Sequence, residues 1–516
     1  MTNQTDICLL LEGTYPFVAG GVSSWVHSLV TSLNEYTFSL AVILPDQTTA
    51  REYKYSIPEN IKEIRPIFLH DLQLPHEHQN RLQKQAWHEI DEFHFCPVNS
   101  NKYELFESIF HNFFNANTRG LAPEQMADHK QAWEILSRLY REKAPDASFI
   151  DYFWTYRFIH YPIFKILISE LPPARVYHTV STGYAGLLGV AAKLKYQRPL
   201  ILTEHGIYTR ERRIEISRAD WIYEKDRQQM KVRKSQSRFK DLWNRMFTSL
   251  SRLCYEYSDV IITLFSGNQK YQMEDGADPG KSLIIANGID IEQFKNLKRA
   301  PKADSKEFVI GFMGRVVSIK DVKTFIRACK AVADVVPKLK VYVMGPTDEE
   351  ESYYEECVQL TAFLGLKNIL QFTGKVDVCE YYPKIDLLVL TSISEAQPLV
   401  ILEANCMGIP VVATDVGACR ELLYGSTEED RALGKSGLIA GITNADEIAR
   451  AIIRIWKSKD LRTKMGQVGK RRVAQFYNKS DLDNQYRKLY RQFIGIDEET
   501  IAQSETISSY ELTQSG

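Results

Sequence analysis

The 516-residue sequence has few cysteines and no long apolar run. Its eight cysteines are scattered with no CxxC pair, which argues against a disulfide framework and against a zinc ribbon. No uninterrupted apolar stretch reaches about 18 residues, the length of a membrane-spanning helix. The first apolar stretch, between Asp6 and Glu12, is too short for a signal peptide. We therefore expect a soluble cytoplasmic protein with reduced thiols.

An excess of charge of one sign is also missing. The chain carries 64 Lys and Arg against 65 Asp and Glu, a formal net charge of −1. This balance removes the general attraction to nucleic acid or to anionic membranes, so any anion binding must be local and no nucleic-acid partner is expected. Hydrophobic residues at 44% and charged residues at 25% are typical of globular proteins, and the length predicts two or three domains.

Two series of short β-branched or leucine-rich runs alternate with helical patterns, which predicts parallel βαβ units. The first series is 7–11, 38–44, 176–180, 200–203, 260–264 and 283–286, and the second is 308–313, 340–344, 369–373, 387–390 and 411–413. A charged stretch at 295–307 between them is typical of a linker. The predicted fold is α/β, with two Rossmann-like domains that face each other across a ligand-binding cleft.

The pattern predicts an N-terminal domain over 1–290 and a C-terminal domain over 291–470. Two segments interrupt the first domain. Residues 70–150 are rich in aromatic, His and amide side chains without strand signals, and predict a helical insertion. Residues 207–240 are basic, and form either an anionic-substrate face or a solvated helix surface. The polar end of the chain, 497–516, predicts a disordered tail.

A glycine-rich turn follows the first predicted strand. Gly20 and Gly21 lack Cβ atoms and precede an amphipathic helical pattern, so a ligand could approach the backbone where helix N–H groups point outward. The turn lacks the GxGxxG fingerprint, which disfavours a nicotinamide enzyme. A plain glycine-rich turn is the alternative interpretation.

Two cations follow the first strand of the second series. Arg315 and Lys320, just after Gly314, lie between a strand and a helix, where they suit one diphosphate. Arg315 could grip two oxygens while Lys320 acts as a point charge. Ordinary surface charge is the alternative.

Two glutamates follow a later strand of the same series. Glu395 precedes Pro398, and Glu403 comes eight residues after Glu395, a separation of about two helical turns. We expect both carboxylates to border one ligand, since carboxylates accept hydrogen bonds from vicinal hydroxyls such as those of ribose.

One histidine ends a strand of the first series. His205 is a candidate site residue because ligands bind at the carboxyl ends of parallel strands, although a structural histidine is the alternative. A second group of possible ligands, His76, His78, His88, His94 and Cys96, fits no common metal pattern, so no metal site is expected.

Together these motifs resemble the GT-B glycosyltransferases of family GT4 over most of the chain. The matching pieces are "GGV" at 20–22, "NGID" at 287–290, Gly314 with Arg315 and Lys320, "FTGKV" at 372–376, and the segment from Glu395 to Glu403. One departure is that Ala396, Gln397 and Pro398 follow Glu395, whereas many family members have Gly and Phe there.

The resemblance implies a retaining, metal-independent transfer from a nucleotide sugar. It places the donor in the C-terminal domain and the acceptor in the N-terminal one, with helices over 471–496 that cross back to the first domain. The implied catalytic residues are His205, Glu395, Arg315 and Lys320. The implied nucleotide-sugar-binding residues are Gly20, Gly21, Arg315, Lys320, Val376, Glu395 and Glu403.

Two longer stretches, 9–27 and 202–216, are similar to the Pel-polysaccharide type of these enzymes. That similarity implies transfer of a hexose or N-acetylhexosamine from a UDP-sugar to a growing exopolysaccharide acceptor. It also implies delivery at the inner membrane to secretion proteins. A GT-B nucleotide-sugar epimerase and a non-catalytic sugar-nucleotide-binding subunit are the alternatives.

Overall fold

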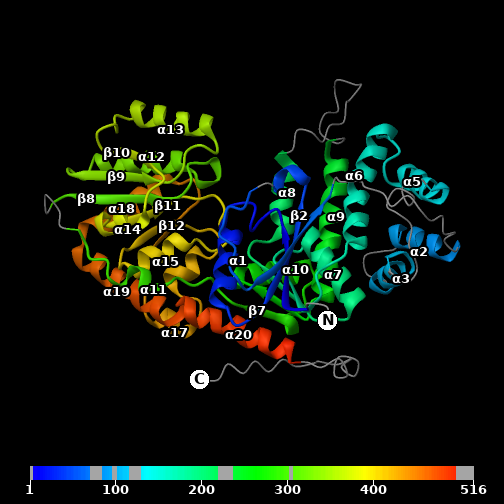
Figure 1. Cartoon of the computed structure of the whole chain (residues 1–516). Helices are drawn as coiled ribbons and strands as arrows, with labels where there is room; N and C mark the ends of the chain where they lie inside the picture. The colour runs from blue at the N-terminus through cyan, green and yellow to red at the C-terminus, as the bar shows by residue number, and fades with distance from the viewer. Residues whose placement is uncertain are drawn as a thin grey trace. The chain divides into compact units, whose positions relative to one another are not determined.

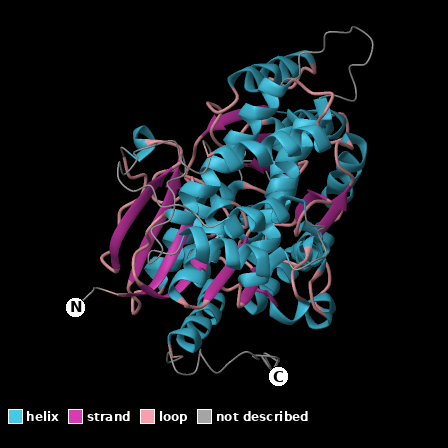
Figure 2. Cartoon of the chain, turned by 90° about the vertical axis from the view of Figure 1, so that its right-hand side faces the viewer, coloured by secondary structure: helices cyan, strands magenta, loops and turns pink. Residues whose placement is uncertain are grey.

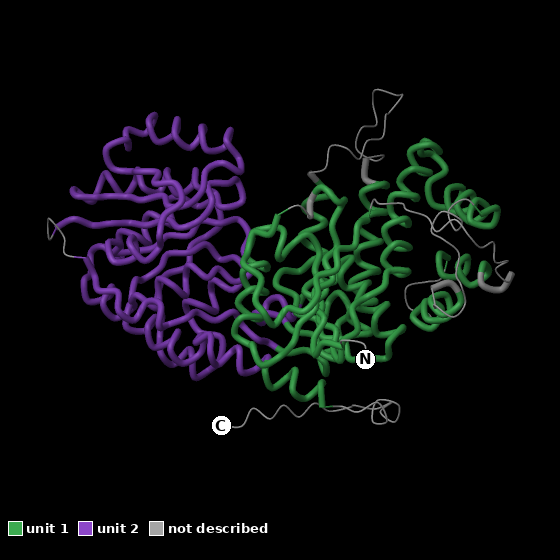
Figure 3. Tube along the Cα trace, viewed as in Figure 1, with its two compact units in different colours: residues 1–262, 271–283, 487–516 green, residues 263–270, 284–486 purple. Residues whose placement is uncertain are grey.

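The computed structural model describes residues 4–50, 52–69, 84–95, 102–114, 129–218, 236–300 and 306–495. The chain divides into two compact units (Figure 3). Unit 1 comprises residues 1–262, 271–283 and 487–516, and unit 2 comprises 263–270 and 284–486. The predicted tail at 497–516 lies outside the described residues, as do parts of both predicted insertions (70–83, 96–101, 115–128 and 219–235).

Unit 1 is built on a seven-stranded sheet in the order β3-β2-β1-β4-β5-β6-β7, and its assigned strand pairs are parallel (Figures 1 and 2). The strands are β1 Thr5–Glu12, β2 Phe38–Leu44, β3 Ile61–Phe68, β4 Ala174–Thr179, β5 Leu200–Glu204, β6 Val260–Thr263 and β7 Ser282–Ile284. The helices up to β7 are α1 Gly21–Ser32, η1 Gln47–Ala50, α2 Lys84–Phe95, α3 Lys102–Phe114, α5 Lys130–Lys143, α6 Phe149–Ile168, α7 Tyr184–Tyr196, α8 Tyr208–Arg218, α9 Gln236–Tyr257, α10 Ser266–Asp275 and η3 Pro279–Lys281.

Unit 2 is built on a six-stranded parallel sheet in the order β10-β9-β8-β11-β12-β13. The strands are β8 Phe308–Met313, β9 Leu339–Met344, β10 Leu370–Gly374, β11 Leu387–Leu390, β12 Val411–Thr414 and β13 Gly437–Ala440. The helices after β7 are α11 Ile291–Lys295, η4 Ser318–Lys320, α12 Val322–Ala333, α13 Glu351–Phe363, α14 Val378–Tyr381, η5 Tyr382–Lys384, α15 Leu399–Cys406, α16 Cys419–Tyr424, α17 Glu428–Ala432, α18 Ala445–Lys457, α19 Lys459–Phe476 and α20 Lys479–Ile494. Residues 487–494 of α20 belong to unit 1.

The strands of unit 2 are buried on both faces, which explains their continuous apolar sequence. Along β11, Leu387 and Val389 pack into one apolar core, while Leu388 and Leu390 pack into another. Side chains alternate across a strand, so the two cores lie on opposite faces of the sheet. Amphipathic helices complete each core. Helix α18, for example, buries Ile448, Ala449, Ile452 and Ile455 and is capped by the side chain of Asn444.

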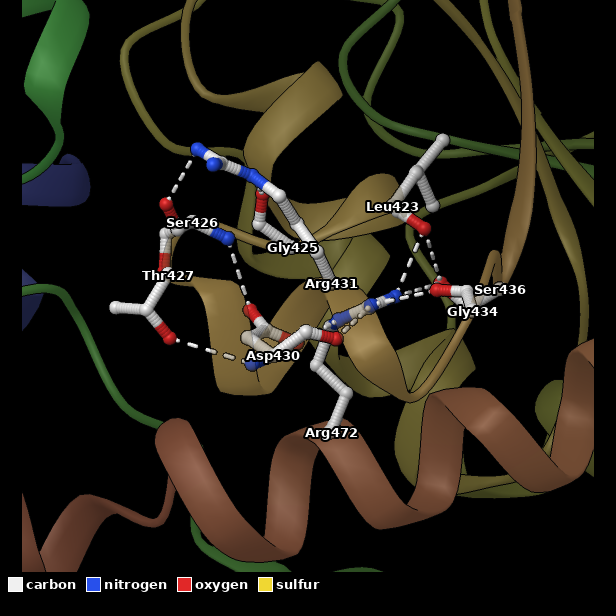
Figure 4. Close-up of polar contacts among 9 residues, drawn as sticks. All are labelled: Leu423, Gly425, Ser426, Thr427, Asp430, Arg431, Gly434, Ser436 and Arg472. Carbon is white, nitrogen blue, oxygen red and sulfur yellow. Dashed lines mark hydrogen bonds and ion pairs between the residues drawn. The ribbon is translucent and has the colours of Figure 1, made fainter.

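A fully buried ion pair ties helix α19 of unit 2 to the short helix α17 and to the segment before β13 (Figure 4). Arg472 on α19 donates from Nε to Asp430 Oδ1 at 2.5 Å, and both side chains are 0% exposed. Its two terminal nitrogens donate to the carbonyl oxygens of Leu423, Asp430 and Gly434. A buried arginine is tolerated here because its donors are satisfied.

Both sheets have the strand order 3-2-1-4-5-6 of a doubly wound fold, extended by β7 in unit 1. In such sheets ligands bind outside the carboxyl ends of the strands, where the strand order reverses. This point lies between β1 and β4 in unit 1 and between β8 and β11 in unit 2. The predicted α/β architecture of two Rossmann-like sheets is confirmed.

Two strands were missing from the sequence prediction. Strand β3 carries Lys62, Glu63 and Arg65 and is largely half-buried at the edge of its sheet, so its sequence lacks an apolar run. Strand β13, with four residues, is too short to stand out. Within the described ranges, none of the helices is both long and apolar enough to cross a bilayer.

Candidate functional site

Lys320 and Glu395 meet at the reversal point of the second sheet. Lys320 ends the short helix η4 after β8, and Glu395 lies in the loop after β11. The Lys320 ammonium forms an ion pair with Glu395 Oε1, and Ser392 Oγ donates to the same oxygen at 2.6 Å. The two charged side chains are only 19% and 12% exposed. The predicted cation and the first predicted glutamate therefore share one site.

Arg315 is engaged by a different carboxylate. Its NH1 nitrogen lies 2.5 Å from both Oε1 and Oε2 of Glu349, and both side chains are about half exposed at 51% and 52%. The neighbouring Glu350 accepts from Ser318 N at 2.9 Å, at the start of η4. The acidic loop after β9 thus holds the Arg315 loop, and an incoming diphosphate would compete with Glu349 for Arg315.

Close backbone approaches hold these loops together. Gly345, at φ +148°, lies so near Gly314 that an added Cβ would stand 2.1 Å from the Gly314 carbonyl oxygen. Gly417, at φ +50°, approaches the loop after β11 in the same way, with an added Cβ 2.2 Å from Glu395 O. Both positions require glycine, because a side chain would clash and its positive φ would be strained. The Lys320 and Glu395 loops are therefore firmly positioned.

Glu403 lies in a separate environment from Glu395. It accepts from Tyr382 Oη at 2.5 Å, and burial raises the pKa values of both the carboxyl and the phenol. The predicted two-turn separation between the glutamates is wrong, because helix α15 begins at Leu399 and Glu395 precedes it. Pro398 is the N-cap residue, with φ −73° and ψ 110°. Its ring also disfavours helical geometry in the preceding Gln397, so the helix does not extend back to Glu395.

Val376 packs, partly buried, against the apolar core that contains Tyr382. It follows β10 by two residues and precedes Asp377, which caps α14. A nucleotide contact at this position stays a prediction.

In unit 1, the predicted glycine turn is open. Gly20 and Gly21 are exposed, and a Cβ built on either would meet nothing within 4 Å. Helix α1 starts directly at Gly21 without a side-chain cap on Gly20. The backbone is therefore accessible at this helix start, and a ligand contact there stays a prediction.

His205 follows β5 and is nearly buried, at 9% exposure. Its ring lies edge-on to Trp25 of α1, with 4.6 Å between ring centroids. Burial lowers the pKa of His205 to about 4. The imidazole is therefore neutral near pH 7, and suits hydrogen bonding to a hydroxyl better than a charge contact to phosphate.

A carboxylate fills the reversal point of the first sheet. Glu12, at the end of β1, accepts from the backbone N–H groups of Tyr184 (2.9 Å) and Ala185 (3.3 Å) at the start of α7. Its other oxygen accepts from Tyr208 Oη at 2.8 Å and from Arg212 NH2 at 3.2 Å. The start of a helix attracts anions because its first N–H groups are unpaired, and at α7 the chain's own Glu12 carboxylate takes that place.

A second carboxyl, Glu204, is fully buried behind His205. It accepts from Tyr255 Oη (2.8 Å), Gln272 Nε2 (2.9 Å) and Tyr208 N (3.0 Å). Burial raises the pKa of Glu204. This network fixes the strand end from which His205 projects.

The sequence analysis named Lys320, Glu395, Glu403 and Arg315, but missed their partners Ser392, Glu349 and Tyr382. Glu349 and Tyr382 come from other segments of unit 2, so no local spacing could reveal them, whereas Ser392 lies three residues before Glu395 in the same loop and was overlooked. Among the described residues, no group of three His, Cys, Asp or Glu side chains is arranged to hold a metal ion. Only His88 and His94 of the predicted His and Cys group lie within the described ranges.

Comparison with known proteins identifies the family. Residues 5–280 match the model "Domain of unknown function (DUF3492)", and residues 293–472 match "Glycosyl transferases group 1". The sheet architecture is that of the GT-B glycosyltransferases. The chain belongs to the DUF3492 family and carries a glycosyltransferase domain of family GT4.

Solved structures resemble this one over almost the whole chain. The sucrose-phosphate synthase of Thermosynechococcus elongatus is 16% identical with a TM-score of 0.56, and covers 94% of this chain and 98% of its own. HepE of Anabaena in complex with UDP is 15% identical, with a TM-score of 0.57. The match covers 94% of this chain and 100% of the HepE chain.

Curated relatives match a smaller part. The D-inositol 3-phosphate glycosyltransferase of Corynebacterium urealyticum is 26% identical over 243 residues, which are 44% of this chain and 55% of that protein. The N-acetyl-alpha-D-glucosaminyl L-malate synthase of Bacillus anthracis is 26% identical over 252 residues, which are 47% of this chain and 62% of that protein. The chain thus spans about half the length of the curated relatives it matches.

Proposed function

We propose that the protein transfers a hexose or N-acetylhexosamine from a UDP-sugar to a growing exopolysaccharide of the Pel type, as a glycosyltransferase of the PelF kind. The observation that carries this proposal is the ion pair between Lys320 and Glu395 at the reversal point of the second sheet. The proposal is supported because a lysine suits a phosphate and a carboxylate accepts from sugar hydroxyls, and because residues 293–472 match glycosyl transferases group 1. HepE, which shares the fold, has been solved with UDP and with UDP-glucose.

The proposed reaction retains the anomeric configuration. The bond between the sugar's anomeric carbon and the UDP oxygen breaks, and the acceptor hydroxyl oxygen bonds to the same carbon from the same face. The hydroxyl proton passes to the departing phosphate, so no protein nucleophile is required. Arg315 and Lys320 stabilise the charge that develops on the leaving diphosphate, the role that a metal has in other transferases.

The proposal gives the two glutamates different roles. Glu403 holds the ribose and Glu395 holds the transferred sugar, while His205 donates a hydrogen bond to a sugar hydroxyl as a neutral imidazole. Glu403→Gln should then weaken binding of UDP, whereas Glu395→Gln should mainly lower turnover. Equal loss of UDP and UDP-sugar affinity in both variants would contradict this division.

Calorimetry with UDP-, GDP- and ADP-sugars tests the donor. We expect binding of a UDP-sugar by the wild-type chain, and a loss of that binding in Lys320→Ala. Lys330→Ala is a matched control, because Lys330 pairs with Asp334 on the exposed side of α12 in the same unit. Product analysis separates the alternatives: a glycoside formed only with an acceptor supports transfer, and an epimer formed without one would support an epimerase.

We also propose that the protein acts in the cytoplasm and delivers its polymer to secretion proteins at the inner membrane. Support comes from exposed apolar side chains on α5 and α6, which are Trp133 (50%), Ile150 (66%), Trp154 (51%) and Phe158 (59%). Large exposed apolar side chains close together often mark an interface. Trp154→Ser combined with Phe158→Ser should release the protein from the membrane fraction while transfer in solution persists; loss of transfer with unchanged fractionation would favour a lid over the acceptor.

A further inference from the structure

The side chain of Gln397 forms two hydrogen bonds with the backbone of one residue, Asn287. Gln397 Oε1 accepts from Asn287 N at 2.7 Å, and Gln397 Nε2 donates to Asn287 O at 3.1 Å. Gln397 is 7% exposed, so both bonds are shielded from water. The amide thereby satisfies both polar groups of one peptide residue, as a neighbouring strand would.

Asn287 itself lies in a firmly held turn. It follows β7, and the next residues pack on the start of α20: Ile289 N donates to Tyr477 O at 2.9 Å, and Lys479 N donates to Ile289 O at 3.0 Å. Gly288 approaches Lys479 so closely that an added Cβ would stand 2.6 Å from its Cα. Gln397 is therefore tied to a rigid part of unit 2.

On the other side, Gln397 ends the loop that carries Glu395. Ala396 O accepts from Ala418 N at 2.8 Å, and Ser392 O accepts from Thr414 Oγ1 at 2.7 Å, which hold the loop to the segment after β12. The N–H groups of Glu395, Ala396 and Gln397 donate no hydrogen bond within the part of the chain that the structure describes. The loop therefore presents free backbone donors beside the carboxylate of Glu395.

We propose that Gln397 is a positioning residue that sets the backbone of Glu395 and Ala396 for the transferred sugar, by clamping this loop to the backbone of Asn287. The proposal rests on the proposed function, since that function gives the Glu395 loop its ligand. Gln397 stands where many GT4 members have a phenylalanine two residues after the first glutamate.

We call the two hydrogen bonds between Gln397 and Asn287 the clamp. In one variant, its stability should depend on pH. In Gln397→Glu, a protonated carboxyl can still accept from Asn287 N and donate to Asn287 O. An ionised carboxylate can only accept, and it faces the carbonyl oxygen of Asn287. The buried position favours the neutral form, so the clamp should hold near pH 5 and open near pH 8. Gln397→Met cannot form the clamp at either pH.

The first measurement needs no ligand. Amide hydrogen exchange of the full chain, followed at Asn287, should be about tenfold faster in Gln397→Met than in the wild type at both pH values, after correction for intrinsic exchange. In Gln397→Glu it should match the wild type at pH 5 and Gln397→Met at pH 8. Gln371→Glu is the control, because Gln371 is exposed on β10 of the same unit. Wild-type protection in Gln397→Met would overturn the clamp.

The second measurement tests positioning. UDP-glucose affinity should fall about tenfold in Gln397→Met, and in Gln397→Glu only at pH 8, while UDP affinity changes less than twofold. If UDP and UDP-glucose affinity fall together, or neither falls, Gln397 does not position the sugar site. If the wild type binds neither ligand, the proposed function fails and the positioning role fails with it, whereas the exchange result still decides whether the clamp exists.

Discussion

The two units share one strand order but fill its reversal point differently. In unit 1, the carboxylate of Glu12 accepts the N–H groups at the start of α7 and is held by Tyr208 and Arg212. In unit 2, the equivalent point carries Lys320 beside Glu395. A doubly wound sheet thus offers the same position twice, and here it holds a carboxylate bonded to helix N–H groups in unit 1 and a lysine–glutamate ion pair in unit 2.

The two units also differ in their histidine content. All eleven histidines lie between residues 27 and 205, so unit 2 has none. Four of them, His94, His160, His178 and His205, have pKa values lowered to between about 3 and 4, with burial as the main cause. A fall in pH should therefore change the stability of unit 1 more than that of unit 2.

The largest expected effect comes from breaking the scaffold of unit 2 alone. Arg472→Met removes the buried cation and leaves Asp430 without its charge partner, which should destabilise unit 2 by about 3 to 5 kcal/mol. Calorimetric unfolding should show one transition moved to lower temperature and the other nearly unchanged. Lys330→Met is the control, because Lys330 forms an exposed pair with Asp334, and it should shift neither transition. Equal shifts of both transitions in Arg472→Met would mean that the two units unfold together.

Lys320→Ala tests whether the reversal point of unit 2 binds the diphosphate. Loss of a charge-assisted contact to phosphate costs about 2 to 3 kcal/mol, so UDP affinity should fall roughly 30- to 150-fold. The variant also leaves the nearly buried Glu395 without its charge partner, so the unfolding transition of unit 2 is followed in parallel to separate lost binding from lost folding. Unchanged UDP affinity by calorimetry would remove Lys320 from the site.

Lowering the pH should destabilise unit 1 in preference to unit 2. A histidine whose folded pKa lies below its unfolded value of about 6.5 adds stability above that value, and this stability is lost as the pH falls toward the folded pKa. For buried His178, with a folded pKa of about 3, the loss at pH 5 is about 2 kcal/mol. The raised pKa values of Glu204 and Glu211 oppose this loss. Unfolding followed at pH 7 and pH 5 should show the larger shift in unit 1, and a larger shift in unit 2 would contradict the histidine argument.

Glu12→Gln tests whether the Glu12 carboxylate stabilises unit 1 at the reversal point of its sheet. It removes the negative charge from the start of α7 and turns one acceptor into a donor, which should destabilise unit 1 by about 1 to 2 kcal/mol. UDP affinity should stay at the wild-type value, because this position is filled by protein. A loss of UDP affinity would show that the first sheet also takes part in nucleotide binding.

The smallest expected effect is a gain in UDP affinity. Glu349→Gln removes the exposed carboxylate that competes for Arg315, so UDP affinity should rise about twofold, in line with about 0.5 kcal/mol for an exposed ion pair. The gain should shrink in high salt. Weaker UDP binding would mean that Glu349 orients Arg315 rather than competing with the ligand.

Local sequence predicted the strands of both sheets except β3 and β13, because buried parallel strands read as continuous apolar runs. It also found Lys320 and Glu395, since loops at strand ends carry the ligands of such sheets. It could not find the bond between Tyr382 and Glu403 or the pairing of Gln397 with Asn287, 110 residues away. These contacts depend on how distant loops fold together. The two-turn prediction for the glutamates failed because Pro398 delays the helix until Leu399.

Helix α20 determines how the protein could be divided for separate study. Its first half belongs to unit 2, where Lys479 bonds to Ile289, and its second half belongs to unit 1, where Tyr490 Oη lies 2.6 Å from Nδ1 of buried His178. A fragment that ends at residue 283 would lack Tyr490 and the salt bridge from Arg487 to Glu35. Unit 1 therefore has to be produced as a discontinuous design, with the second half of α20 joined back through an artificial linker, whereas the run Ile284–Tyr486 of unit 2 already includes the first half of the helix.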